Sequence, residues 1–381
     1  MNDIIPFQKP YFTGTEIKAL QASLTNKKLS ADGQFTNICQ TFLNSNFNYR
    51  ESLLTHSCTA ALEIAALSIK IEPGDEVIMP SYTFVSTANA FALRGAKIVF
   101  ADCKSDLPNI DETKIEALIS PNTKAIVVVH YAGIACEMDA LISICKKHNL
   151  VLIEDAAHAI GATYKGAFLG SFGDISTLSF HETKNISCGE GGALIINNKN
   201  FSDTCHQIRE EGTNKLDFLK GRVREYEWVN LGSSYAPSEL NAAVLSEQLL
   251  HLDHVLNSRI KIWRKYHSAL SPLEHLRHIA LPSVPEFSEH NSHIFYIVCS
   301  SLSTRNKLME FLKNNMIQVC FHYQPLHLSP FFTQNHQKVE LTNTQKFSDG
   351  LIRLPLYPGL TDAELEFIVA KIFNFFRCSY T

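Results

Sequence analysis

The sequence predicts an α/β protein in which a large, mainly parallel β-sheet domain is followed by a smaller α+β domain. Between residues 54 and 200, short β-branched runs alternate with helical segments. These runs are hydrophobic almost throughout, which is typical of parallel strands buried on both faces. The pattern changes after about residue 237, and a chain of 381 residues is long enough for two domains. We therefore predict domains at 1–250 and 251–381.

The first domain is expected to begin with two amphipathic helices, at 14–24 and 37–46. The strands of its sheet are then expected at 76–80, 96–103, 124–131, 150–156, 174–180 and 192–198, and its helices at 59–69, 86–95, 112–119 and 138–148. Such alternation requires right-handed crossovers. The carboxyl ends of the parallel strands then meet at one edge of the sheet, where functional groups collect.

The second domain follows a long helical run that starts at residue 237. A strand at 293–300, a helix at 305–315, a strand at 318–323 and a final helix at 362–376 are expected after it. This mixture indicates an α+β arrangement rather than a continuation of the parallel sheet.

Composition and charge exclude several classes of function. A net charge of −4 and a pI near 6.5 argue against a protein that binds nucleic acid or an acidic membrane, because such proteins usually have a basic face. No apolar run approaches the roughly 18 residues of a spanning helix, and the N-terminus lacks a signal-peptide pattern, so a cytoplasmic location is expected. The ten cysteines contain no CxxC pair and are predicted to be reduced thiols. Three HxxH spacings lack acidic or Cys partners, so no metal site is predicted.

The run 179–192, SFHETKNISCGEGG, places Lys184 in a polar loop that follows a strand. A lysine in a loop is usually only a solvated charge, so a functional role for Lys184 requires suitable residues near it. Asp155 ends the strand at 150–156 and is expected at the same edge of the sheet. A reactive amine and a carboxylate would then lie close together.

The start of the first helix of the sheet supplies a third feature. Ser57, Cys58 and Thr59 would place backbone N–H groups and a hydroxyl at its N-terminus, which is a site suited to an anion. A Ser or Thr at this position is also an ordinary helix cap. Amine, carboxylate and phosphate site together fit pyridoxal 5′-phosphate, whose aldehyde needs a lysine and whose ring nitrogen needs an acid. Phe84 is expected to cover the ring face.

Several segments resemble the sugar aminotransferases of the DegT/DnrJ/EryC1/StrS family: SCTAALE, PSYTFVSTANA, EDAAH, SFHETKN with GEGG, and YQPLH. The resemblance runs over essentially the whole chain and implies the pyridoxal-phosphate-dependent transferase fold type I, which is aspartate aminotransferase-like. It implies a transaminase whose partners are glutamate and a nucleotide-linked keto sugar. The segments ACEMD and GSSY are most similar to the branch that converts dTDP-4-keto-6-deoxyglucose into dTDP-4-amino-4,6-dideoxygalactose. The glucose epimer and another keto sugar remain alternatives.

The resemblance also implies roles for individual residues. Lys184 matches the catalytic lysine that carries the cofactor, and Asp155 matches the partner of the ring nitrogen. His158 matches the residue beside the phenolic oxygen of the cofactor. The remaining matches are Cys58 (through its backbone), Thr59 and Ser179 for the phosphate, Phe84 for the ring face and His327 for the substrate side.

The family further implies a homodimer in which the segment after Gly232 reaches the phosphate of the neighbouring subunit. Many relatives have Asn four residues beyond this glycine, whereas this chain has Ala236. Ser234, or its neighbour Ser233, is the expected replacement donor.

Two functions outside this family are alternatives. An α/β binding or regulatory protein without the cofactor would show no long-wavelength absorbance band after purification. A NAD-dependent sugar oxidoreductase would carry GxGxxG after its first strand, and this sequence lacks it.

Overall fold

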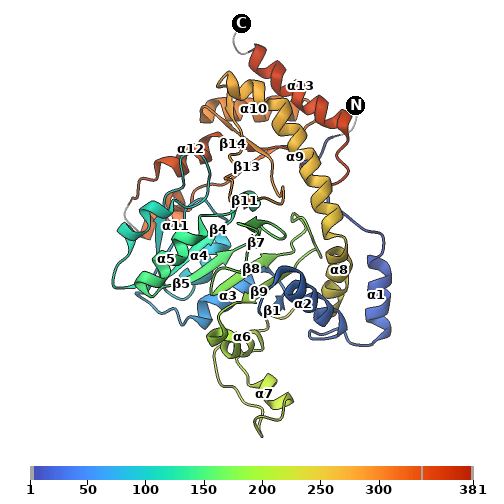
Figure 1. Cartoon of the computed structure of the whole chain (residues 1–381), viewed down its shortest axis with the longest axis vertical. Coiled ribbons are helices and arrows are strands. Elements are labelled where there is room, and N and C mark those ends of the chain that lie inside the picture. Colours follow the sequence, from blue (N-terminus) through green and yellow to red (C-terminus); the bar gives the residue numbers. More distant parts are fainter. Residues whose placement is uncertain (1–3, 336–337, 379–381) are drawn as a thin grey trace.

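The computed structural model describes residues 4–335 and 338–378 (Figure 1). A large α/β body occupies the middle of the molecule, and a smaller α+β region lies above it. The segment that contains α7 (Lys215–Leu219) projects from the opposite end of the body. Among the described residues, no helix combines the length and the hydropathy that a membrane span requires.

The body contains a seven-stranded sheet. Its strand order is β1 (Ser52–Thr55), β9 (Gly192–Ile196), β8 (Ile175–Ser179), β5 (Val151–Asp155), β4 (Thr123–Val129), β2 (Glu76–Pro80) and β3 (Lys97–Ala101). The five strands from β8 to β3 are parallel, which confirms the prediction of a mainly parallel sheet. The prediction that the run at 192–198 is also parallel is wrong, because β9 is antiparallel to both β8 and β1. No crossover helix separates β8 from β9, so the chain returns in the opposite direction.

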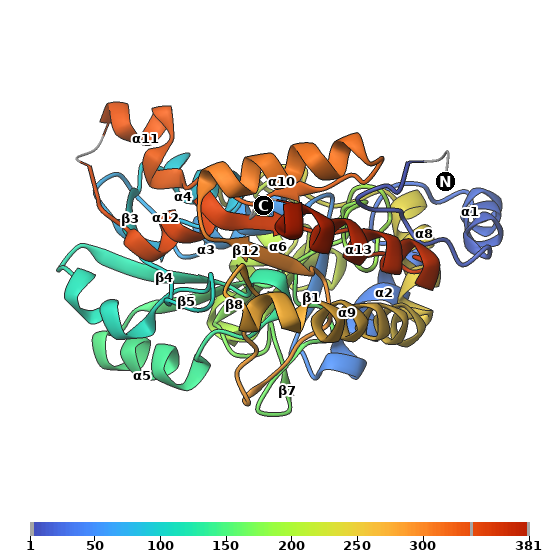
Figure 2. The same cartoon turned by 90° about the horizontal axis from the view of Figure 1, so that it is seen from above.

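Helices cover both faces of this sheet. On one face lie α2 (Gln34–Phe47), α5 (Met138–His148) and α8 (Glu239–Leu250), and on the other lie α3 (Cys58–Ser68), α4 (Val85–Ala92) and α6 (Ser202–Arg209). Seen from above, α4 and α5 lie on opposite sides of the strands (Figure 2). Successive strand residues point to opposite faces, and accordingly Val77 and Met79 join the α3 side whereas Ile78 joins the other. This double burial explains why the strands are hydrophobic throughout.

The C-terminal region is built on an antiparallel sheet of four strands. Their order is β10 (Ile279–Ala280), β12 (Tyr296–Cys299), β14 (Leu351–Arg353) and β13 (Cys320–Phe321). The helices α9 (Leu252–His275), α10 (Leu302–Asn314) and α13 (Asp362–Cys378) pack on it around a core of its own. Ile5 belongs to this core and pairs with Ile317, so the N-terminal strand segment lies with the C-terminal region. The domain division at residues 250 and 251 stays a prediction.

Other elements differ from expectation in their local detail. The helix expected at 112–119 is two short 3₁₀ turns, η1 (Glu112–Lys114) and η2 (Glu116–Leu118), and Ile119 is already extended. Pro121 follows closely, and the residue before a proline disfavours helix. The long run from residue 237 is two helices that meet at His251. The remaining elements are α1 (Glu16–Thr25), α11 (Pro330–Asn335), α12 (Thr342–Gly350), β6 (Thr163–Tyr164), β7 (Ala167–Phe168), β11 (Ser288–Glu289), η3 (Tyr131–Gly133), η4 (Lys199–Phe201) and η5 (Leu326–Leu328).

Glu154 is a completely buried carboxylate in the middle of the sheet. It accepts hydrogen bonds from three backbone N–H groups of the turn 170–173, at 2.6–2.9 Å. His130 contacts it through Nε2 at 2.9 Å, while Nδ1 of the same ring accepts from the N–H of Cys136. Burial alone would raise the pKa of Glu154, but the contacts with His130 and the backbone outweigh burial and lower it. The buried charge is therefore fully compensated.

We predict that Glu154→Gln destabilises the protein by about 3 kcal/mol, because an amide cannot replace the charge-assisted hydrogen bonds. Urea unfolding measures the change in the free energy of unfolding. The exposed Glu286→Gln serves as control and should change it by less than about 0.5 kcal/mol. Since folding lowers the pKa of Glu154, its contribution is present at neutral pH and is lost as the pH falls through that pKa. Equal stability of the two variants at neutral pH would contradict this role.

Candidate active site

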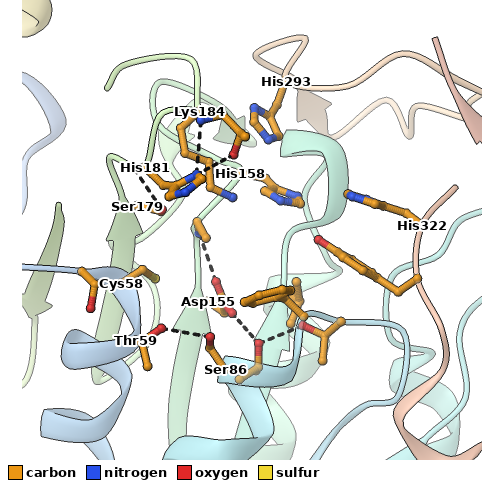
Figure 3. Close-up of a pocket in the computed structure, with 18 of the residues that line it drawn as sticks. Cys58, Thr59, Ser86, Asp155, His158, Ser179, His181, Lys184, His293 and His322 are labelled. Carbon is orange, nitrogen blue, oxygen red and sulfur yellow. Dashed lines mark hydrogen bonds between the residues drawn. The ribbon is translucent and has the colours of Figure 1, made fainter. Parts of the chain in front are cut away.

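A cavity of about 530 Å³ lies between the carboxyl edge of the large sheet and the C-terminal region (Figure 3). The ends of β4, β5 and β8 contribute Val129, Asp155 and Ser179. The opposite wall includes His322, which follows β13, and Arg353, which ends β14. Because parallel strands end together, residues far apart in the sequence meet here.

The cavity brings together most of the residues that the sequence singles out. Seven of them line it: Cys58, Thr59, Phe84, Asp155, His158, Ser179 and Lys184. Figure 3 shows Lys184 above Asp155, with Cys58 and Thr59 to one side. Phe84 is 59% exposed at the mouth, and its ring centroid lies 6.5 Å from that of Tyr323.

Asp155 is a buried carboxylate held by neutral donors. Its Oδ2 accepts from the hydroxyl of Thr87 at 2.7 Å, and its Oδ1 accepts from the N–H of Ala157 at 3.1 Å. No cationic side chain of the described residues forms an ion pair with it. A buried anion with this surrounding favours a cation placed beside it, and a protonated pyridine nitrogen is such a cation.

Lys184 lies in the connection between β8 and β9 and is half-buried. Its backbone N–H donates to the carbonyl of His181 at 2.9 Å, which fixes a tight turn. Burial lowers the pKa of its amine to about 8, and the charge of Arg353 acts in the same direction, against the opposing effects of Cys58 and Asp155. A neutral amine is therefore available near neutral pH, as a nucleophile and general base require.

The N-terminus of α3 fits a phosphate group. The hydroxyl of Ser57 caps the helix by accepting from the N–H of Ala60 at 3.1 Å. Within residues 4–335 and 338–378, no acceptor reaches the N–H of Cys58 or of Thr59. The Thr59 hydroxyl lies 2.9 Å from that of Ser86. Unsatisfied N–H groups beside hydroxyls at a helix N-terminus are the arrangement that binds phosphate.

His158 is buried, and burial lowers its pKa well below its usual range, so the imidazole is neutral. Its Nδ1 accepts from the N–H of Ala132 at 3.4 Å. The ring hydrogen therefore lies on Nε2, which makes this atom a donor. A donor at this place suits an oxygen substituent of the cofactor ring.

Two predicted residues lie outside the cavity. His327 was expected on the substrate side, but it is 2% exposed, and its Nδ1 contacts the Ser81 hydroxyl at 2.7 Å. This contact joins its segment to the chain after β2, and the nearby His322 and Tyr323 line the cavity. The substrate-side role of His327 stays a prediction. Ser234 is exposed on the surface and does not reach the cavity of its own chain.

Sequence reasoning missed several lining residues. Ser86 and Thr87 stand in the same segment as Phe84, PSYTFVSTANA, and lie in the first turn of α4, so their nearness to Phe84 was a usable signal. His293 and Arg353 come from the C-terminal region. Arg353 stands in no local motif, and the HxxH spacing of His293 does not indicate a place in this cavity. Only the packing of the two regions brings them to Lys184.

Comparison with known proteins decides the family. The model of the DegT/DnrJ/EryC1/StrS aminotransferase family matches residues 10–373. The chain belongs to this family. Among solved structures it is similar to PseC of Helicobacter pylori, an aminotransferase involved in the biosynthesis of pseudoaminic acid, with 26% identity over 99% of this chain and 100% of that chain and a TM-score of 0.91.

Two further relatives contain the cofactor. Spr1654 of Streptococcus pneumoniae in its PLP form is 26% identical over 98% of both chains, with a TM-score of 0.90. NtdA of Bacillus subtilis with bound PMP is 27% identical over 98% of this chain and 86% of that chain, with a TM-score of 0.86. The DegT/DnrJ/EryC1/StrS chain described here is thus an enzyme, a pyridoxal-phosphate-dependent aminotransferase of fold type I.

We predict that Lys184 in the cofactor-free protein reacts with an amine-directed acylating reagent with a midpoint near pH 8. The reactive form is the neutral amine, whose fraction rises as the pH rises through the lowered pKa. Peptide mapping by mass spectrometry gives the labelling rate, and the exposed lysines of the same digest give the reference profile. A midpoint near the ordinary value of 10.5 would show that the cavity does not desolvate the amine.

Proposed function

We propose that this aminotransferase transfers the amino group of L-glutamate to the keto group of dTDP-4-keto-6-deoxy-D-glucose. The products are dTDP-4-amino-4,6-dideoxy-D-galactose and 2-oxoglutarate. The observation that carries the reaction class is the meeting of the Lys184 amine, the Asp155 carboxylate and the N-terminus of α3 in one cavity. The sugar substrate is supported by the resemblance of the sequence to the galactose-forming branch and by the likeness to PseC.

The cofactor supplies an electron sink when it is bound, and the protein positions it. The N–H groups of Cys58 and Thr59 would hold its phosphate, with the hydroxyl of Ser179 beside them. Asp155 would keep the ring nitrogen protonated, because a nearby carboxylate raises the pKa of a cation. His158 would donate from Nε2 to the phenolic oxygen. Phe84 would cover one face of the ring.

Lys184 then moves the proton. Its amine takes a proton from the Cα of glutamate in the first half of the reaction and returns one to C4 of the sugar in the second. The lowered pKa of about 8 suits both directions, since an acid–base group works best near the operating pH. The two walls of the cavity keep the reacting carbon within reach of the amine.

The configuration at C4 depends on which face of the sugar is presented to Lys184. The lysine can deliver a proton only from its own side of the cofactor plane. We assign the galacto configuration from the similarity of whole-chain segments, and the alternative is the 4-amino-4,6-dideoxyglucose epimer or another nucleotide-linked keto sugar.

Incubation of the enzyme with glutamate and dTDP-4-keto-6-deoxy-D-glucose is predicted to yield a 4-amino sugar whose H4 has small couplings in the proton NMR spectrum. An axial amine, as in the galacto form, leaves H4 equatorial and its couplings small. Assay of 2-oxoglutarate in the same mixture establishes transamination independently of the configuration. Large couplings would identify the gluco product, and the absence of any amino sugar despite active enzyme would exclude this substrate.

A homodimer with shared active sites is part of the proposal. The arm at 213–231, which projects from the body in Figure 1, exposes several large apolar side chains. Trp228 is 76% exposed and Leu219 is 71% exposed. Apolar groups gathered on a projecting segment favour burial against another chain. A symmetric dimer would cover the arm and bring Ser233 and Ser234 near the phosphate end of the other cavity.

Mixing two inactive variants should therefore restore activity. One carries Lys184→Ala, and the other carries Ser233→Val with Ser234→Val. After subunits reassort, up to one cavity in each mixed dimer has both an intact lysine and intact serines from the neighbour. Sedimentation of each variant establishes dimer formation first. Failure to recover any activity from reassorted dimers would rule out sharing of these serines.

A further inference from the structure

His293 is a buried imidazole in the cavity wall with one unpaired nitrogen. The residue is 3% exposed, and its Nδ1 lies 2.9 Å from Oδ1 of Asn185, the neighbour of Lys184 in the sequence. No group within residues 4–335 and 338–378 forms a hydrogen bond with its Nε2, yet this atom is not among the fully enclosed polar atoms of those residues. Nε2 therefore borders the cavity, and Figure 3 shows the ring beside Lys184 and His158.

The hydrogen bonds of Asn185 fix which nitrogen of His293 carries the hydrogen. The side-chain N–H of Asn185 donates to the backbone carbonyl of Asn291 at 3.1 Å, and a carbonyl can only accept. The amide oxygen of Asn185 is therefore the atom that faces Nδ1 of His293, and Nδ1 must be the donor. Nε2 is then an unprotonated acceptor.

The loop that carries His293 is held from several sides. Arg259 donates to the backbone carbonyls of Ser292 and His293, at 3.1 and 2.7 Å. The side chain of Asn291 donates to the carbonyl of His158 at 2.8 Å, and the rings of His158 and His293 lie 4.4 Å apart, centroid to centroid. The acceptor at Nε2 is thus placed before any substrate arrives, and little ordering remains for binding.

The imidazole of His293 is neutral, which decides the kind of group that it can bind. Burial lowers its pKa well below its usual range, and four basic neighbours act in the same direction: His158, Lys184, Arg259 and Arg353. A neutral acceptor does not bind a carboxylate or a diphosphate, since these groups offer acceptor oxygens. It requires an O–H or N–H group.

Of the two proposed substrates, the keto sugar supplies such a group throughout the reaction. Glutamate carries two carboxylates and one ammonium group, whose nitrogen is the atom that is transferred. The hydroxyl groups of the sugar do not react. Because His293 contacts the residue next to Lys184, whose amine must reach the keto carbon, the hydroxyl should lie beside that carbon. In a 4-keto-6-deoxy sugar, C3 carries a hydroxyl, whereas C5 carries the ring oxygen and the methyl group.

We propose that Nε2 of His293 accepts a hydrogen bond from the 3-hydroxyl of the keto sugar and so selects substrates with a hydroxyl beside the keto carbon. The inference rests on the proposed function and adds the residue that recognises the sugar next to its reacting carbon. Asn185 is a positioning residue in this arrangement, because it engages Nδ1 and leaves Nε2 to the substrate. A sugar without this hydroxyl would leave a buried acceptor unsatisfied, which is more costly than a hydrogen bond lost in water.

The first test is nitrogen-15 NMR of the histidine-labelled holoenzyme without substrate. Near neutral pH, Nδ1 of His293 is expected to be protonated and Nε2 unprotonated. The signals are assigned by their loss in His293→Gln. A protonated Nε2 would overturn the inference, whatever the sugar substrate is.

The second test compares dTDP-4-keto-6-deoxy-D-glucose with its 3-deoxy analogue through kcat/KM. His293→Phe removes the acceptor and keeps a ring, and His293→Gln keeps an acceptor at the end of the side chain. The exposed His275→Phe is the matched control. The absorbance of the bound cofactor and the melting temperature establish that each variant is folded.

The wild-type enzyme is expected to prefer the sugar with the 3-hydroxyl by on the order of 10-fold, as a lost hydrogen bond at a buried acceptor implies. His293→Phe should reduce this preference to less than about 2-fold. Any disturbance of Lys184 in this variant slows both sugars alike, so the ratio of the two kcat/KM values is unaffected by it. His293→Gln should show an intermediate preference, and His275→Phe that of the wild type.

Equal preference in the wild type and in His293→Phe would overturn the inference. Loss of turnover by the same factor for both sugars would make His293 a support for Lys184 and not a contact of the sugar. If the enzyme aminates a different nucleotide-linked keto sugar, the sugar proposed above is refuted. The preference is then measured with that sugar and its analogue without the hydroxyl beside the keto carbon, and the same ratio decides the role of His293.

Discussion

The buried carboxylate of Glu154 is the contact on which the active-site edge of the sheet depends. It accepts from the turn 170–173 and from His130, and so it joins β5 to the segments that flank it. Asp155 follows by one residue, and its position is therefore set by the strand and not by its own contacts alone. The two adjacent acidic residues thus have different roles. Glu154 fixes the backbone of β5, and Asp155 faces the cavity.

The C-terminal region holds two loops of the cavity at once, the one that contains His158 and the one that contains Lys184. Asn291 donates to the backbone carbonyl of His158 at 2.8 Å, and its own carbonyl accepts from the side chain of Asn185 at 3.1 Å. His293 contacts Asn185 through Nδ1 at 2.9 Å and lies 4.4 Å, centroid to centroid, from His158. Arg259 of α9 anchors this segment by donating to the carbonyl of His293 at 2.7 Å. The residue beside Lys184 and the loop of His158 therefore share one support.

The sequence could predict the features that leave a pattern in neighbouring residues, and it could not predict those that depend on contacts between distant residues. The parallel strands were predictable because burial on both faces makes them hydrophobic throughout. The positions of Asp155 and Lys184 beside the cavity were predictable, because Asp155 ends one strand and Lys184 follows another, each within a recognisable motif. The direction of β9 was not, since a run of apolar residues has the same pattern in either direction. Arg353 and His293 were also missed, because they come to the cavity only through interactions with residues more than 100 positions away in the sequence.

The connection from β8 to β9 determines how far the amine of Lys184 lies from the N-terminus of α3. This connection carries Lys184, and it ends at Gly192, where a Cβ would lie 2.5 Å from the backbone N of Cys58. Only a glycine allows the strand to approach the start of α3 so closely. The same short segment thus governs the separation between the amine of Lys184 and the N–H groups at the start of α3 that we propose for the phosphate. With both ends of that span set by the backbone, the protein can select a cofactor by its length as well as by its chemistry, and a pyridoxal without its phosphate would engage one end only.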